Sequence, residues 1–132
     1  QPMLARVLVV DDSAAMRAFV RAAIEETGAA AEVLEAKSGF EALRLLPRER
    51  FDAAIVDINM PDIHGLEVIR FMRASDAHKD TPVLVISSEA SARDREKGMA
   101  LGASEWLAKP FTSSALREAL ARITAARAGT GG

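Results

Sequence analysis

Strand and helix patterns alternate five times along this chain. Five short runs rich in β-branched and other apolar residues predict strands. These runs cover Arg6–Val10, Glu32–Ala36, Asp52–Asp57, Pro82–Ser87 and Ser104–Ala108. After each run, apolar residues recur three or four positions apart, as on one face of a helix. Such strict alternation favours a parallel sheet joined by right-handed crossovers, with helices on both faces.

Capping residues indicate where the helices begin. Ser13 and Thr112 each precede an apolar stripe, and Ser38 precedes Glu41 at the spacing of a capping box. The first helix should end at Gly28. Its buried stripe is predicted to comprise Met16, Phe19, Val20, Ala23 and Ile24.

Two later helices are predicted from Gly65 to about Ala74 and over Ser91–Leu101. The second is polar in its middle and has a thin apolar stripe, so we expect it to be weakly held. The strand at Glu32–Ala36 is more polar than the others, which favours a place at the edge of the sheet.

Polar side chains follow four of the predicted strands. Asp11 and Asp12 follow the first strand, Asp57 ends the third, Ser87 ends the fourth and Lys109 follows the fifth. The carboxyl ends of parallel strands lie along one edge of a sheet, and ligands bind there. We therefore expect these five side chains to lie in one pocket.

The chemistry of this pocket points to a cation and a phosphoryl group. Three carboxylates and one ammonium leave the site with a charge of about −2, which a hard divalent cation with oxygen ligands would offset. An aspartate can accept a phosphoryl group covalently. Asp57 is the better acceptor because it lies on the central strand, while Asp11 and Asp12 are free to hold the metal. Ser87 and Lys109 would then contact the phosphoryl oxygens.

Each of these residues also has a plainer explanation. An aspartate at a strand end is commonly a helix cap or a turn former, and Asp11, Asp12 and Ser13 could be capping residues alone. A lysine before a proline is commonly a solvated surface residue, and Ser87 could belong to a polar loop. Their placement at the ends of four strands favours one shared site over four coincidences.

Composition limits the class of protein. A length of 132 residues suits one domain, and 49% hydrophobic with 27% charged residues is typical of a globular chain. A net charge of −2 argues against a nucleic-acid-binding surface. The sequence has no cysteine and no apolar run of about 18 residues, so we expect a cytoplasmic protein without membrane insertion.

The motif set resembles the receiver domain of two-component response regulators, most closely the stand-alone chemotaxis type. The matching segments are Val9–Ser13, Val56–Gly65, Ile86–Ser88, Gly102–Ala103 and Lys109–Phe111. The resemblance runs from about Ala5 to Ile123. It implies a flavodoxin-like α/β fold with strand order 2-1-3-4-5. It also implies a receiver domain over residues 3–126, followed by a flexible tail or linker start at 127–132.

The resemblance implies roles for the site. Asp57 would accept a phosphoryl group from the phosphohistidine of a sensor histidine kinase or phosphotransfer protein. Asp11, Asp12 and Asp57, with the Asn59 backbone carbonyl, would hold Mg²⁺, with Mn²⁺ as the alternative. Such a domain catalyses its own phosphorylation and dephosphorylation and is not a conventional small-molecule enzyme.

The resemblance also implies how the signal is timed and transmitted. Ser87 and the residue at position 106 would form the switch, and Lys109–Pro110 would be a cis peptide. Asn59 and Glu89 would tune the lifetime of the phosphoryl group, unless they only vary as surface residues. A downstream protein would bind the face formed by the helix Ser91–Leu101, the last strand and the final helix.

The chain departs from the family at the switch. Trp106 stands where the family usually has Tyr or Phe. Its indole is larger and carries an N–H group. Either it stays partly outside, as an anchor for a partner, or small neighbours such as Ala103 or Ala108 enlarge its pocket. His64 is expected to be exposed and without a catalytic role.

The sequence leaves three alternatives to a stand-alone phosphorylation switch. A Mg²⁺-dependent aspartyl phosphohydrolase needs an acid two residues after its nucleophile, and Asn59 stands there. A pseudo-receiver binds partners without phosphorylation, which the complete polar set disfavours. The chain could also be a receiver module cut from a larger regulator with an output domain.

Overall fold

Five parallel strands form the centre of the computed structural model, which describes residues 4–28, 30–88 and 92–131. The elements are β1 (Leu4–Val10), α1 (Ala14–Thr27), β2 (Ala30–Ala36), α2 (Gly39–Leu45), β3 (Ala53–Asp57), α3 (Gly65–Ala74), β4 (Val83–Ser87), α4 (Ala92–Leu101), β5 (Glu105–Ala108) and α5 (Ser113–Gly131). The strand order is β2-β1-β3-β4-β5, and every neighbouring pair is parallel. The predicted fold class and the edge position of β2 are confirmed.

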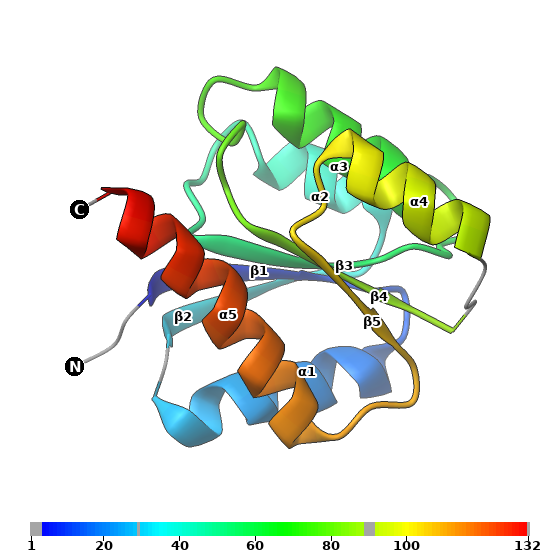
Figure 1. The fold of residues 1–132 in the computed structure, drawn as a ribbon. Helices are drawn as coiled ribbons and strands as arrows, with labels where there is room; N and C mark the ends of the chain where they lie inside the picture. Colours follow the sequence, from blue (N-terminus) through cyan, green and yellow to red (C-terminus); the bar gives the residue numbers. More distant parts are fainter. Residues whose placement is uncertain (1–3, 29, 89–91, 132) are drawn as a thin grey trace.

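Helices cover both faces of the sheet. Helices α1 and α5 lie on one face, and α2, α3 and α4 lie on the other (Figure 1). The alternation of side chains along β1 divides the core accordingly. Val7 and Val9 belong to the cluster beneath α1 and α5, whereas Leu8 and Val10 belong to the cluster beneath α2 and α3. Strands β3 and β4, which both lie in the interior of the sheet, are buried along their whole length, as parallel strands covered on both faces should be.

The predicted caps are present. Ser13 Oγ accepts a hydrogen bond from the Met16 N–H at 3.2 Å, and Gly28 ends α1 with a left-handed backbone, φ 66°. Thr112 Oγ1 likewise accepts the Ala115 N–H at 3.0 Å. Both caps could be predicted from the sequence because a capping side chain and the N–H group that donates to it lie within one helical turn.

The capping box of α2 forms with one change. Ser38 Oγ accepts the Glu41 N–H at 3.0 Å, as predicted. The Glu41 carboxylate, however, accepts the N–H of Lys37 at 3.1 Å, one residue before the cap.

The buried stripe of α1 is narrower than predicted. Val20, Ala23 and Ile24 are buried, but the prediction for Phe19 is wrong, because its side chain is 40% exposed. It lies at the margin of the helix face and contacts the ring of Phe111, with the two centroids 5.9 Å apart.

Strand and helix ends differ from the predictions by one or two residues at several places. The first strand begins at Leu4, since Leu4 pairs with Ala30 of β2. At the other end of the chain, residues 127–131, expected as a tail, continue α5 to Gly131. The flexibility expected for that segment stays a prediction. Among the described residues, no helix is both long enough and apolar enough to cross a membrane.

Candidate functional site

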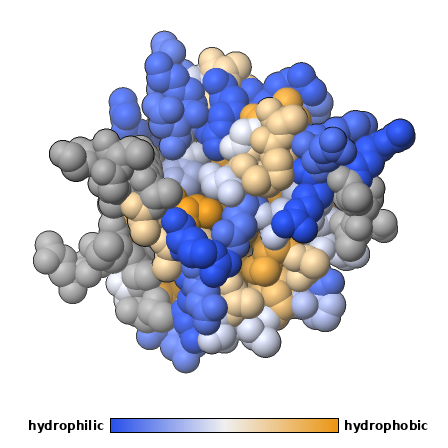
Figure 2. Space-filling model, viewed as in Figure 1, coloured by the Kyte–Doolittle hydropathy of each residue, from blue (hydrophilic) through white to orange (hydrophobic). Residues whose placement is uncertain are grey.

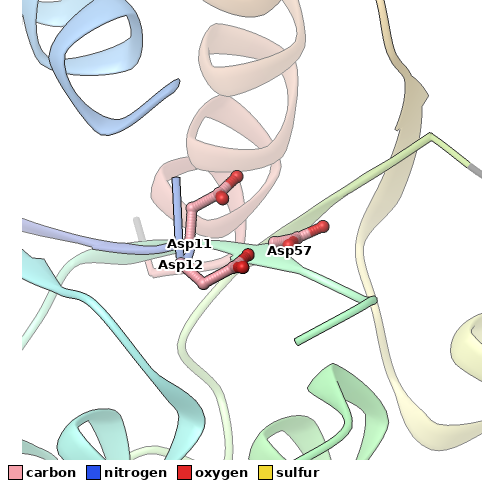
Figure 3. Close-up of side chains that lie close together, drawn as sticks. All are labelled: Asp11, Asp12 and Asp57. Carbon is pink, nitrogen blue, oxygen red and sulfur yellow. The ribbon is translucent and has the colours of Figure 1, made fainter. Parts of the chain in front are cut away.

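Three carboxylates meet at the carboxyl ends of β1 and β3. The two strands are neighbours, with Val10 opposite Val56, so Asp11 and Asp12 emerge beside Asp57. One carboxylate oxygen from each aspartate lies within 4.8 Å of the others (Figure 3). Asp11 and Asp57 are buried, whereas Asp12 is exposed. The site is therefore closed on the protein side and open at Asp12.

Lys109 connects the two buried carboxylates. Its Nζ lies 3.0 Å from Asp11 Oδ2, across 98 positions of the chain, and 3.4 Å from Asp57 Oδ1. The Lys109 side chain is itself largely buried. One ammonium thus serves two carboxylates in a poorly solvated place, which leaves the cluster with an excess of negative charge.

The backbone around Asp11 holds that side chain in place. Its Oδ1 accepts the Ser13 N–H at 2.9 Å, and its own N–H donates to the Ala36 carbonyl at the end of β2, at 3.1 Å. Arg17 donates from Nη1 to the Asp11 carbonyl at 2.7 Å. The corner after β1 is thereby fastened to both α1 and β2.

Ser87 lies at the end of β4, one position beyond Ile86, which pairs with Asp57. Its side chain is fully buried, and its carbonyl accepts the Lys109 N–H at 2.8 Å. The expected convergence of the four strand ends is therefore present. The Lys109–Pro110 peptide is cis, as the resemblance implied.

Burial raises the pKa of the Asp57 carboxyl above its ordinary value, and the neighbouring Asp11 carboxylate raises that pKa further. The Lys109 ammonium and the Asn59 N–H, 3.4 Å from Asp57 Oδ1, act in the opposite direction. The first two effects prevail, so the ionised form of Asp57 is costly here. Added positive charge would relieve that cost, and three converging carboxylates are the donors that a hard divalent cation prefers.

A glycine lets the site close. A Cβ atom at Gly65 would lie 2.3 Å from the Asp57 carbonyl oxygen, so no larger residue fits where α3 begins. The Gly65 N–H also donates to the Ile58 carbonyl at 2.9 Å. His64, next to it, is exposed, and its Nδ1 accepts the Leu66 N–H at 3.2 Å. His64 is therefore the cap of α3.

Trp106 lies inward, in the same core cluster as Leu8 and Val10, with 8% of its surface exposed. A Cβ at Gly98 of α4 would lie only 2.7 Å from the Trp106 Cζ3 atom. Gly98 thus makes the space for the indole. Of the two small neighbours predicted for this role, Ala103 is in the same cluster but Ala108 is exposed.

Asn59 and Glu89 are the two residues predicted to tune the lifetime of the phosphoryl group. Asn59 is exposed in the loop that follows Asp57, and Glu89 lies outside the described residues. The sequence analysis assigned no role to Asp62. The Asp62 carboxylate accepts backbone N–H groups at the start of α2, 22 and 23 positions away, and no local signal could indicate this.

The comparisons with known proteins agree with this geometry. The family model for the response regulator receiver domain matches residues 7–121. The response regulator MprA of Mycobacterium leprae is 41% identical over 120 residues, covering 91% of this chain and 50% of the relative. The chain thus spans about half the length of the curated relatives that it matches.

Solved structures are similar over nearly the whole chain. The chemotaxis response regulator CheY4 of Vibrio cholerae has a TM-score of 0.84 at 38% identity, covering 91% of this chain and 98% of that one. The receiver domain of the sensor histidine kinase PA1611 from Pseudomonas aeruginosa has a TM-score of 0.81 at 27% identity, covering 92% and 98%. That domain was solved with a magnesium ion coordinated in its active site cleft.

Proposed function

The chain belongs to the response regulator receiver family of two-component signalling, and on this basis we propose that it is a switch controlled by phosphorylation of Asp57. The observation that carries the proposal is the position of Asp57. Its buried carboxylate lies at the end of the central strand, beside two further carboxylates and within reach of Lys109.

Asp11, Asp12 and Asp57, together with the Asn59 backbone carbonyl, would hold Mg²⁺, with Mn²⁺ as the alternative. Oxygen donors of this kind suit both ions. When bound, the cation supplies positive charge for the carboxylates and for the oxygens of a phosphoryl group. The magnesium ion in the 27% identical Pseudomonas receiver supports this assignment.

Asp57 would act as the nucleophile. One of its oxygens forms the new bond to phosphorus while the P–N bond of a partner's phosphohistidine breaks, and the electron pair of that bond stays on the imidazole. The partner would be a sensor histidine kinase or a phosphotransfer protein. In the reverse half of the cycle, water attacks phosphorus and the Asp57 carboxylate leaves, which releases inorganic phosphate. The domain would thus catalyse its own dephosphorylation.

Lys109 and Ser87 would serve the transferred group. The Lys109 ammonium already contacts Asp57 and would pair with a phosphoryl oxygen, which is the kind of electrostatic help that phosphoryl transfer needs. Ser87, buried at the end of the next strand, would donate its hydroxyl to another oxygen. We propose Ser87 and Trp106 as the switch pair, and Asn59 and Glu89 as the residues that tune the lifetime.

A downstream protein would bind the face formed by α4, β5 and α5. This face mixes hydrophilic and hydrophobic surface (Figure 2), and Met99 is exposed on α4. Because the curated relatives are about twice as long as the matched region, the partner could be a further domain of the same protein. We propose that the protein acts in the cytoplasm, as predicted from the sequence.

The two rival functions have less support. The position two residues after Asp57 holds Asn59, which cannot protonate a leaving group as a phosphohydrolase requires. A pseudo-receiver, which binds partners without being phosphorylated, does not require the carboxylate cluster and its shared lysine, and both are present here.

The proposal is tested by incubating the protein with acetyl phosphate and Mg²⁺ and measuring its mass. We expect one added phosphoryl group, removable by hydroxylamine, and none in EDTA. Asp57→Asn should abolish the addition, whereas Asp76→Asn, at an exposed aspartate, should leave it unchanged. A phosphoryl group that maps to His64 or to a serine would contradict the proposal.

A further inference from the structure

The loop after the acceptor, residues 58–64, is fastened at both ends. At its base, the Gly65 N–H donates to the Ile58 carbonyl at 2.9 Å, next to Asp57. At its tip, the Asp62 carboxylate receives two hydrogen bonds from α2: Oδ1 from the Gly39 N–H at 3.2 Å and Oδ2 from the Phe40 N–H at 2.9 Å. Asn59 lies between these two anchors.

Close packing reinforces the contact at the tip. A Cβ at Gly39 would lie 2.7 Å from Ile63 Cβ and 2.9 Å from the Ile63 carbonyl oxygen, so the loop rests directly on the first residue of α2. The Phe40 N–H, together with the N–H groups of Ile63 and Gly39, holds the pKa of Asp62 below its ordinary value, although burial acts in the other direction. The charged form of Asp62 is therefore the one that fits this place.

The start of α2 is also connected, through the end of β2, to the backbone of Asp11 on the other side of the carboxylate cluster. Only Lys37 and Ser38 separate α2 from Ala36, the last residue of β2. The Ala36 carbonyl accepts the Asp11 N–H at 3.1 Å. A continuous set of contacts thus runs from the loop that carries Asn59, through Asp62 and the start of α2, to the corner that carries Asp11.

We propose that Asp62 is a positioning residue for the cation site. By fastening the loop 58–64 to α2, it sets where the Asn59 backbone lies relative to the Asp11 and Asp12 carboxylates. This inference rests on the proposed function, because it requires that these groups bind a divalent cation together. If Asp62 only capped α2, its loss would lower stability without changing the affinity for the cation.

The experiment measures Mg²⁺ affinity without any phosphoryl donor. The melting temperature is followed against Mg²⁺ concentration at about 0.15 M KCl, which screens distant charges beyond about 8 Å. The apparent Kd follows from the dependence of stability on free ligand. Asp62→Ala should raise this Kd about tenfold. This is the lower limit of the loss of metal affinity that follows when a residue that supports a metal ligand is removed.

Ser38→Ala is the matched control. It removes one cap bond from the same helix, the one to the Glu41 N–H, but leaves the contacts of Asp62 intact. Its melting temperature should fall while its Kd for Mg²⁺ stays that of the wild type. Asp62→Asn keeps one oxygen acceptor without the charge, so its Kd should lie between those of the wild type and Asp62→Ala.

The inference is overturned if Asp62→Ala and Ser38→Ala leave the Kd equally unchanged, or if both raise it to the same extent. It is also overturned if Asp62→Asn is as impaired as Asp62→Ala, since the charge alone would then explain the loss. A wild-type protein whose melting temperature ignores Mg²⁺ would instead contradict the proposed cation site itself.

Discussion

At the scale of single residues, the acceptor carboxylate is held in a place that disfavours its charge. Asp57 is buried beside Asp11, and the two share the ammonium of Lys109. A buried carboxylate that lacks a full partner costs stability. Functional sites commonly carry such costs, because the arrangement suited to the reaction differs from the arrangement suited to the fold.

We therefore expect Asp57→Asn to raise the free energy of unfolding in EDTA at pH 7 by about 1 kcal/mol, as stabilising changes commonly do. The folded pKa of Asp57 is raised, so the folded protein takes up this proton at a higher pH than the unfolded chain does. The wild type should gain stability relative to Asp57→Asn as the pH falls through that raised pKa towards the ordinary value. Urea denaturation at several pH values measures the difference.

The control is the same urea denaturation series on Asp76→Asn, which measures the effect of removing one carboxylate at an exposed position. A lower stability of Asp57→Asn at pH 7 in EDTA would contradict this view of the acceptor.

At the scale of elements, helix α4 packs on the rest of the domain through few buried residues. Among its residues 93–101, only Gly98 is buried, and Met99 is 44% exposed. Gly98 lies against the ring of Trp106 and close to Leu66 of α3. A helix with so few buried contacts has low local stability, which is typical of elements that move in switches.

Two effects compete when Gly98 becomes alanine. Helix propensity alone would stabilise α4 by about 1 kcal/mol. Overpacking of a filled core costs about 1–3 kcal/mol, and a new Cβ would lie 2.7 Å from Trp106 Cζ3, on a buried and rigid ring. We expect overpacking to prevail, so that Gly98→Ala lowers stability in chemical denaturation.

The control is a double-mutant cycle with Trp106→Phe, whose smaller ring leaves room for the new methyl group. The double variant should be more stable than the sum of the single changes predicts, by about 1 kcal/mol. Ala100→Gly, at an exposed position of α4, measures propensity alone. A stabilising Gly98→Ala would show that the indole moves aside at little cost.

At the scale of the whole molecule, β5 connects the site to α4. Lys109 follows the last residue of this strand, and Trp106 lies on it, facing α4. A phosphoryl group adds about −1.5 to −2 of charge at pH 7, and it would compete with Asp11 and Asp57 for the Lys109 ammonium. Movement at the end of β5 would then reach Trp106 and the weakly held helix that rests on it.

We accordingly expect the phosphoryl mimic beryllofluoride, added with Mg²⁺, to change the fluorescence of Trp106. Amide hydrogen exchange in residues 92–101 should shift under the same conditions, while the buried turns of α1 stay protected. Ser87→Ala should weaken both responses, because its hydroxyl would contact the mimic. Unaltered fluorescence together with unaltered exchange in α4 would place the output on another face.

The local pattern by itself determined the succession of strands and helices along the chain, their caps and the edge of the sheet at which the polar site residues lie. Caps such as Ser13 and Thr112 act within one helical turn, and the apolar runs are contiguous. Since parallel strands end along one edge, the residues after those strands had to converge. This is why the sequence alone predicts that Asp57 and Lys109 lie together, although 52 positions separate them in the chain.

The tertiary structure alone decided the contacts between elements. Asp62 meets α2 only because the loop after β3 packs on that helix, and Trp106 faces inward only because α4 brings Gly98 over it. Phe19 has the spacing of a core residue, yet the margin of α1 where it lies remains partly uncovered. A periodic pattern shows which face of an element is apolar, but the partner that covers each position follows from packing between distant segments.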